Sequence, residues 1–245
     1  MQTIFGINPL LEALKIRDVR IKKIVIAESR GGDALRKIVN LARQRGIPLE
    51  FRERSYLDKL TGQKSHQGVV GICEIFDYVS VDDVIANCCA GLKHNLILIL
   101  DSIMDPQNLG SLIRTSHCFG ANGVIIPENR SAAVTASVMK ASAGAAHHIP
   151  IAMVVNLSQT IEYLKEKGFW IYGADPVSGE HIGAYNYKSH ICLVMGSEGR
   201  GIRPLIKKKC DFLLSIPIIG KIDSLNVSVA AGIILYEMLR AWEKV

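Results

Sequence analysis

The 245-residue sequence lacks the features that mark membrane proteins, secreted proteins and metal sites. No apolar run approaches the roughly 18 residues of a membrane-spanning helix, and the N-terminus shows no basic stretch followed by an apolar segment and a cleavage site. Six cysteines and seven histidines are present, but neither a C-x-x-C pair nor an H-x-x-x-H spacing occurs. We therefore expect a cytoplasmic protein with reduced, mostly buried thiols, no membrane association and no metal.

Common nucleotide-binding and hydrolytic motifs are also absent. The glycine-rich residues 196–201 follow the order G-x-x-G-x-G, and no acidic residue stands about 20 positions later to hold a ribose, as an ordinary dinucleotide site needs. There is no G-K-[ST] phosphate loop, no Cys–His or Ser–His–Asp nucleophile set and no carboxylate pair spaced for hydrolysis. These absences disfavour a dinucleotide-binding protein and a hydrolase.

The net charge of +6 is concentrated in the first quarter of the chain. Residues 1–65 hold 14 lysines and arginines against 7 aspartates and glutamates, a balance of +7, whereas residues 66–245 hold 15 against 16, a balance of −1. Such a field attracts polyanions, nucleic acid above all, by neutralising phosphates. It also occurs on surfaces that only keep a protein soluble, so both interpretations stay open at this point.

The hydrophobic pattern of residues 1–75 indicates a small alternating α/β module. Helices are expected from Asn8-Pro9 and over 33–45, and strands over 21–27, 48–52 and 68–75. Basic residues fall mainly on the outer face of the second helix, namely Arg36, Lys37, Arg43 and Arg45. The polar loop 59–67 contains His66 and Gln67, which either contact RNA or cap a strand.

Residues 76–93 lose periodicity apart from one possible helical turn, and we expect them to be a linker. The second domain, residues 94–245, alternates strictly between strands and helices. Strands are expected over 96–100, 123–126, 149–154, 169–173, 191–195 and 212–218, and helices over 107–119, 132–143, 157–167, 203–208 and 227–242. Near-continuous Val, Ile and Leu strands between amphipathic helices predict an α/β fold with a parallel sheet covered on both faces.

Polar, glycine-rich residues follow three of these strands, at the sheet edge where parallel α/β folds bind ligands. After the first strand, Asp105 is expected to cap a helix, and Asn108 and Arg114 are expected to face the same open side. The second stretch is the sequence MGSEGRG at 195–201, and the third is the turn 215–232. There Ser224 and Asn226 precede a helix, and they either cap it or line a slot for a small ligand. Together the three stretches predict a cleft for a nucleoside-like ligand without naming a reaction.

These stretches resemble a known set of motifs. Asn108-x-Gly110-x-x-x-Arg114-Thr115, then Met195–Gly201, then Ile216-Pro217 with Ser224-Leu-Asn-Val-Ser228 look like motifs 1, 2 and 3 of the SpoU/TrmH branch of the SPOUT RNA 2′-O-ribose methyltransferases. All three occur in order across residues 95–245. With its basic N-terminal module and the sequence His66-Gln67-Gly68, the whole chain is most similar to members that methylate a guanosine of 23S ribosomal RNA.

The resemblance implies features that spacing does not show. The second domain would be an α/β trefoil knot, in which the C-terminal segment threads through a loop. Residues 1–75 would form an RNA-binding domain similar to the ribosomal L30e/L7Ae fold. The implied cofactor is S-adenosyl-L-methionine, the implied partner is 23S ribosomal RNA, and the implied assembly is a homodimer with the active site at the subunit interface.

Site residues follow from the same resemblance. The cofactor would be enclosed by Met195, Gly196, Ile216, Pro217 and Leu225, and the catalytic set would be Asn108, Arg114, Glu198, Ser224 and Asn226. A ribose hydroxyl is a poor nucleophile until its proton leaves, so alignment and electrostatic help should dominate catalysis. A guanidinium stays protonated in proteins. We therefore expect Arg114 to clamp the target phosphate while Asn108, Ser224 or a phosphate oxygen accepts the proton, and Arg200 adds charge beside the pocket.

Two alternatives remain. One is a sibling methyltransferase acting on transfer RNA, but such relatives typically carry short extensions rather than a substantial N-terminal module. The other is an RNA-binding or assembly protein that no longer methylates. The presence of Asn108, Arg114, Glu198 and Asn226 argues against it.

Overall fold

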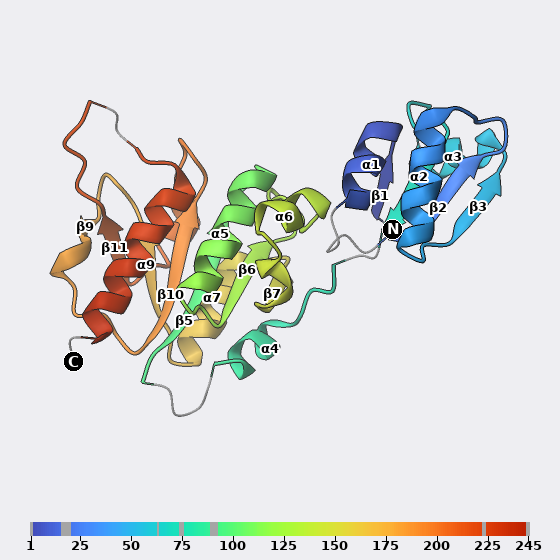
Figure 1. Cartoon of the computed structure of the whole chain (residues 1–245). Coiled ribbons are helices and arrows are strands. Elements are labelled where there is room, and N and C mark those ends of the chain that lie inside the picture. The colour runs from blue at the N-terminus through green and yellow to red at the C-terminus, as the bar shows by residue number, and fades with distance from the viewer. Residues whose placement is uncertain are drawn as a thin grey trace. The chain divides into compact units, whose positions relative to one another are not determined.

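The computed structural model describes residues 2–15, 21–62, 64–73, 76–88, 93–221 and 224–243. The chain divides into two compact units, Met1–Asp77 and Tyr78–Val245. Figure 1 labels β1, β2 and β3 in the first unit and, among others, β5 and β10 in the second. Each unit has its own sheet and its own apolar core.

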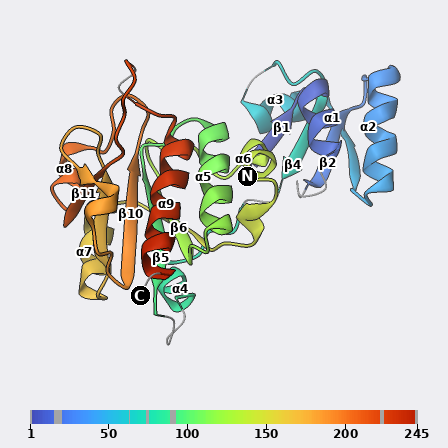
Figure 2. The same cartoon turned by 60° about the vertical axis from the view of Figure 1, so that its left-hand side comes forward.

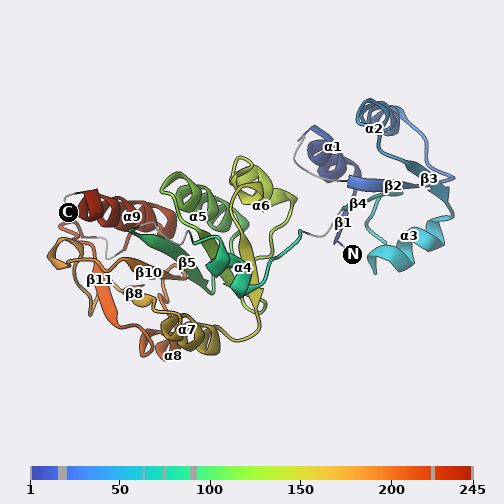
Figure 3. The same ribbon diagram turned by 90° about the horizontal axis from the view of Figure 1, so that it is seen from below.

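The first unit is built on a four-stranded mixed sheet in the order β1-β4-β2-β3. Its strands are β1 (Gln2–Phe5), β2 (Ile21–Ala27), β3 (Leu49–Arg52) and β4 (Val69–Cys73), and its helices are α1 (Ile7–Lys15), α2 (Asp33–Gln44) and α3 (Arg54–Thr61). β4 pairs antiparallel with β1 and β2, and β3 pairs parallel with β2. Figure 3 shows α1 and α2 on one face of this sheet and α3 on the other. Successive residues of β2, such as Ile24 and Val25, are therefore buried on opposite faces.

Two elements of this unit go beyond the sequence-based expectation. β1 is only four residues long, too short to show a clear alternation. α3 buries one residue, Leu57, and Glu53 at its start makes no side-chain cap. The first residues of the segment expected as a polar loop, 59–67, form the last turn of α3. The helix ends at Thr61, and Gly62 caps it in a left-handed conformation.

The second unit holds, within the described residues, a seven-stranded sheet in the order β7-β6-β5-β10-β8-β11-β9. Its strands are β5 (Asn95–Asp101), β6 (Gly123–Pro127), β7 (Ile151–Val154), β8 (Trp170–Ala174), β9 (Glu180–His181), β10 (His190–Gly196) and β11 (Phe212–Ser215). All of the pairings between these strands are parallel. Every residue of β5 is buried, as a central strand covered on both faces requires. The α/β class with a parallel sheet is confirmed.

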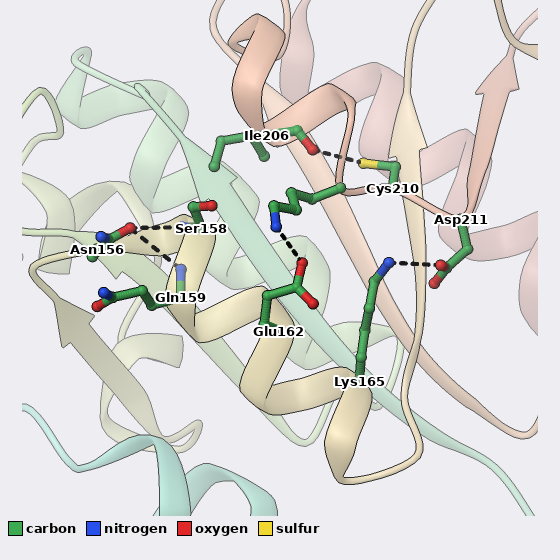
Figure 4. Close-up of polar contacts among 9 residues, drawn as sticks. Asn156, Ser158, Gln159, Glu162, Lys165, Ile206, Cys210 and Asp211 are labelled. Atoms are coloured by element: carbon green, nitrogen blue, oxygen red, sulfur yellow. Dashed lines mark hydrogen bonds and ion pairs between the residues drawn. The ribbon is translucent and has the colours of Figure 1, made fainter.

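Helices cover both faces of this sheet (Figure 3). One face carries α5 (Pro106–Cys118), α6 (Ala136–Ala141) and α9 (Val227–Glu243), and the other carries α7 (Leu157–Glu166) and α8 (Pro204–Lys207). Asn156 caps α7 by accepting hydrogen bonds from the backbone N–H groups of Ser158 and Gln159, at 3.0 and 3.3 Å (Figure 4). No described helix is long and apolar enough to cross a membrane.

The segment expected as a linker, 76–93, differs in part from that expectation. Residues 78–88 belong to the second unit, because α4 (Val81–Ala86) packs the fully buried Val84 into the core beneath α7. Val79 N donates to the Ile151 carbonyl at 3.0 Å. Ser80 and Asp83 form a reciprocal capping box at the start of α4, and their S-x-x-D spacing was the available sequence signal. Residues 89–92 lie outside the described residues.

Five of the six cysteines lie in the described part of the chain, and all five are free thiols. Cys73 and Cys192 are buried, Cys88 and Cys210 are half-buried, and Cys118 is exposed. Burial raises the pKa of Cys73 to about 11 and that of Cys210 to about 12. Such thiols stay protonated near neutral pH and serve as core residues rather than nucleophiles.

Candidate active site

The strand order places a crevice at the carboxyl ends of β5 and β10. From β5 the chain builds outward through β6 and β7, and β10 later returns to lie on the other side of β5. Neighbouring strands whose connections leave in opposite directions form the crevice in which open α/β sheets bind ligands. Asp101 and Gly196 are paired in register where the two strands end. The loops that carry the first two motifs therefore start side by side.

The loop after β10 is a tight turn that requires glycine. Ser197 and Gly201 exchange two backbone hydrogen bonds, of 3.1 and 2.8 Å. A Cβ atom on Gly196 would lie 2.1 Å from the carbonyl carbon of Gly201, and Gly199 and Gly201 have φ of +78° and +64°. The turn brings the Glu198 side chain toward the start of α9.

Asn226 joins the three motifs. Its Nδ2 donates to Asn108 Oδ1 at 3.0 Å and to Glu198 Oε1 at 2.6 Å. Its Oδ1 accepts hydrogen bonds from Ser228 N at 3.0 Å and Val229 N at 3.4 Å, as a helix cap does. The sequence left open whether this residue caps α9 or belongs to a polar site, and the structure has it do both.

Two cavities meet at Glu198. The smaller, of about 300 Å³, lies between the ends of β8, β10 and β11 and α9, and the larger, of about 850 Å³, lies between the β5 and β10 loops. Both volumes are in the range of small-molecule sites. Asn108 lines the larger cavity. Among the proposed cofactor residues, Met195, Gly196, Ile216 and Leu225 line the smaller one, as does Ser224, whereas Pro217 is not part of its lining.

The smaller cavity suits a cationic nucleoside. Its walls are largely apolar, with Leu214, Ile216, Ala230 and Ile234, while the glycine turn brings backbone groups close. Its charged lining residues, within the described part of the chain, are the two acids Asp175 and Glu198. Burial alone raises the pKa of Asp175. The Lys207 ammonium and the N–H groups of Ser178 and Val177 together lower the pKa by more, so the net shift is downward and the carboxylate stays charged. An apolar slot with acidic groups fits the adenosyl and sulfonium parts of S-adenosylmethionine.

Arg114 lies outside this cluster. Its side chain is exposed and lines neither cavity, so the expectation that it faces the same side as Asn108 is wrong. Six residues of α-helix turn by about 600°, which leaves the two side chains about 120° apart on α5. Within one chain, the structure brings together Asn108, Glu198 and Asn226 but not Arg114.

His66 and Gln67 hold the backbone of the first unit. His66 is fully buried, with Nε2 at 2.8 Å from Asp58 Oδ1, and its Nδ1 accepts a hydrogen bond from Gly68 N at 3.0 Å. Gln67 Oε1 accepts from Ile7 N at 2.9 Å. Of the two interpretations left open, the structure favours strand capping over RNA contact for this pair.

Asp101 and Arg203 were missed as site residues. Asp101 is fully buried at the end of β5, and its Oδ1 accepts from Arg203 Nε at 2.6 Å. The partners are 102 residues apart in sequence, so no local pattern could pair them. The only signal was an acid directly after an apolar strand. No group of three metal-ligating side chains occurs in the residues that the structure covers.

Known proteins match the chain over both units. The model of the SpoU rRNA methylase family matches residues 95–236, and a model for RNA 2′-O-ribose methyltransferase substrate binding matches residues 3–79. The chain is 40% identical to a Bacillus subtilis protein named for the TrmH family of tRNA/rRNA methyltransferases, YacO, over 97% of this chain and 94% of that protein. It is 37% identical to the 23S rRNA (guanosine-2′-O-)-methyltransferase RlmB of Coxiella burnetii, over 99% and 97%.

Solved structures agree with this match. The AdoMet-bound rRNA methyltransferase from Sinorhizobium meliloti superposes with a TM-score of 0.63 at 26% identity, covering 97% of this chain and 86% of that one. The SpoU methyltransferase AviRb from Streptomyces viridochromogenes shares the fold, with a TM-score of 0.63 at 20% identity, covering 99% and 91% of the two chains. The expected relationship is thus confirmed, and the chain belongs to the SpoU rRNA methylase family of RNA 2′-O-ribose methyltransferases.

Proposed function

We propose that this protein transfers the methyl group of S-adenosylmethionine to the ribose 2′-hydroxyl of a guanosine in 23S ribosomal RNA. The observation that carries the proposal is the hydrogen-bonded junction of Asn108, Glu198 and Asn226 at the meeting point of two cavities. One cavity suits the cofactor, and the other leaves room for a nucleotide. The choice of 23S RNA is supported by 37% identity to the Coxiella enzyme over nearly the whole chain.

The catalytic residues act mainly by alignment. The cofactor supplies an already activated sulfonium methyl group. Asn226 holds Glu198 and Asn108 in fixed positions, and the cap that it forms on α9 ties their geometry to a 17-residue helix. Asn108 Oδ1 already accepts a hydrogen bond from Asn226. Of the three proton acceptors considered, Ser224 and a phosphate oxygen of the RNA are therefore better placed.

We further propose that Arg114 reaches the site from a second copy of the chain. On α9, Val229, Ile233 and Tyr236 are 50%, 37% and 59% exposed and form one apolar stripe with helical spacing. α9 lies beside α5, which carries Arg114 (Figure 2). A homodimer packed through this stripe would cover the apolar side chains and supply the guanidinium that the single chain does not bring to Asn226. Ile233→Glu should give monomers in sedimentation with cofactor binding retained; dimers of this variant would contradict the stripe as the interface.

The first unit is proposed to deliver the RNA. It carries the excess of basic residues and matches the substrate-binding family model. An L30e-like relationship for this unit, a knotted path for the second unit and a cytoplasmic location remain part of the proposal.

The test is to incubate the protein with tritiated S-adenosylmethionine and, separately, unmodified 23S RNA and unmodified tRNA. Label in 23S RNA alone is the expected result. Label in tRNA alone would favour the tRNA-acting alternative, and no label in either RNA would favour a protein that binds RNA without methylating it.

A further inference from the structure

Three arginines line the larger cavity, and the proposed chemistry uses none of them directly. They are Arg130, Arg200 and Arg203, which come from the loops after β6 and β10. Within the part of the chain that the structure describes, Arg130 and Arg200 have no ion-pair or hydrogen-bond partner. By contrast, the smaller cavity is lined, among described residues, by no lysine or arginine. The larger cavity thus has three cations against the two acids Asp105 and Glu198, whereas the charged lining of the smaller cavity is acidic.

Arg203 is held in place by a buried carboxylate. Asp101 has no exposed surface; its Oδ1 accepts from Arg203 Nε at 2.6 Å and its Oδ2 from Arg203 N at 2.8 Å. Burying a charge is costly, and a buried ion pair is weak evidence for stability. The pair does, however, fix one edge of the guanidinium. The four Nη hydrogens stay free of described protein acceptors, on a side chain that is 36% exposed.

Arg130 is held by its backbone. It has φ of +62°, a left-handed conformation that costs a non-glycine residue about 1 kcal/mol or more. The following residues bind the β5 loop, since Ala132 N donates to the Ile103 carbonyl at 2.8 Å and Ser131 Oγ donates to the same carbonyl at 3.3 Å. Ser102 in that loop has φ of +66° and lines the same cavity. Two of the four described non-glycine residues with positive φ thus lie at one cavity.

We propose that Arg203 and Arg130 form a binding subsite for a phosphodiester of the RNA strand next to the target ribose, with Asp101 as the positioning residue for Arg203. The inference rests on the proposed function and deepens it. A guanidinium with a free Nη edge binds phosphate oxygens in a bidentate manner. Because its opposite edge is fixed by Asp101, less side-chain freedom is lost when the phosphate binds. The subsite lies beside Asn108 and Glu198, so a bound phosphodiester would set the register of the strand against the transferred methyl group.

The charge difference between the cavities argues against the obvious alternative ligand, the carboxylate of the cofactor. A sulfonium ion with an ammonium group is better matched by the acids Asp175 and Glu198 of the smaller cavity. The larger cavity, of about 850 Å³, is lined by three guanidinium groups against the two carboxylates of Asp105 and Glu198. Its excess of cations is better matched by an RNA strand, whose phosphates the guanidinium groups can bind.

The test compares four variants of the full chain: Arg203→Gln, Arg130→Gln, Arg203→Lys and Asp101→Asn. RNA affinity is measured on an unmodified 23S fragment at several salt concentrations, cofactor affinity by calorimetry, and methyl transfer by single-turnover kinetics. Lys209→Gln is the matched control, because Lys209 is also a cation in an ion pair, 2.6 Å from Glu162, and belongs to the α7 face of the sheet. Thermal melting and cofactor affinity identify any variant that fails to fold.

We expect Arg203→Gln and Arg130→Gln each to lower RNA affinity about tenfold and to reduce the slope of log affinity against log salt by about 0.7, the value for one single-strand phosphate contact. Cofactor affinity should not change. Asp101→Asn keeps the charge of Arg203 but replaces one acceptor oxygen by an NH₂ donor. That donor would face either the guanidinium or the backbone N–H of Arg203, so one of the two hydrogen bonds is lost. KM for RNA should therefore rise several-fold while kcat changes little, and Arg203→Lys should fall between wild type and Arg203→Gln.

Wild-type RNA affinity and salt slope in both glutamine variants would overturn the subsite, and so would an effect no larger than that of Lys209→Gln. Weakened cofactor binding with an unchanged RNA slope would assign Arg203 to the cofactor instead. Failure of the proposed function is distinguishable, because wild-type protein would then bind RNA without methyl transfer. Absence of RNA binding by the wild type would overturn both.

Discussion

Asn226 offers a substitution that separates its two structural roles. Asn226→Asp keeps an oxygen to accept from Ser228 N and Val229 N, so the cap on α9 is retained. The same change replaces the Nδ2 donor by a carboxylate oxygen at 2.6 Å from Glu198 Oε1. Two carboxylates at that distance repel by about 1.6 kcal/mol at the dielectric of water and about 6 kcal/mol at an effective dielectric of 20. The side chains must separate or share a proton.

We therefore expect Asn226→Asp to lower the single-turnover methyl-transfer rate about 100-fold near pH 7.5, because the alignment of Glu198 and Asn108 is lost. Part of the rate should return on acidification, as one proton comes to bridge the pair. Asn226→Ala should lose both roles, which costs about 2 kcal/mol or about 4–8 °C in melting temperature for a chain of this size.

Asn156→Ala is the matched control, since Asn156 caps α7 in the same way but lies outside the site (Figure 4). It should cost about 1 kcal/mol of stability and leave the rate unchanged. Rates are measured with tritiated S-adenosylmethionine at saturating RNA, and stability by thermal melting. A near-normal rate for Asn226→Asp at pH 7.5 would refute the idea that this junction aligns the reaction.

Three further outcomes follow from single contacts. Gly110→Ala would place a Cβ 2.4 Å from Ala141 Cβ, so α5 and α6 must separate, at a cost of about 2 kcal/mol in the free energy of unfolding measured in urea. Gly232→Ala is the control, because its Cβ would lie 3.7 Å from the nearest atom, and it should be neutral or stabilising. Equal effects of the two substitutions would contradict the packing. His66→Ala should destabilise the first unit by about 2–4 kcal/mol and give an early unfolding transition in circular dichroism. Tryptophan fluorescence should not report this transition, because Trp170 and Trp242 both lie in the second unit. A matching shift in fluorescence would argue against separate cores. The pKa of Asp175 is lowered in the folded protein, so its contribution to stability is present above its unfolded pKa of 3.8 and is lost as the pH falls through the folded pKa. Asp175→Asn should therefore melt below wild type at pH 7 but converge with it in strong acid. A constant difference in melting temperature at all pH values would exclude this carboxylate as the cause.

The main architecture could be predicted because buried strands appear in the sequence as continuous apolar runs. β5 and β10 are buried on both faces and read as continuous apolar runs. Since parallel strands end at the same edge, the segments after these strands, which carry Asn108, Glu198 and Asn226, are expected to converge, and they do. The position of β10 beside β5 was not predictable, because it depends on a pairing between segments about 95 residues apart.

Three other features of the fold and the site were not predicted from the sequence, each for its own physical reason. Six residues of α-helix are not two full turns, so the spacing of Asn108 and Arg114 does not put the two side chains on one side of α5. Val84 anchors α4 in the second core although its segment looked like a linker, because one buried residue in a short helix gives little periodicity. The Asp101–Arg203 pair depends on tertiary proximity alone.

Methyl transfer followed by alkaline hydrolysis tests the central claim most directly. A 2′-O-methylated ribose has no free hydroxyl to attack the adjacent phosphodiester, so the bond beside it survives alkali. With tritiated S-adenosylmethionine and unmodified 23S RNA, the label should appear in an alkali-stable dinucleotide whose first residue is guanosine. Label released only in mononucleotides, or no label at all, would contradict a crevice built for ribose methylation.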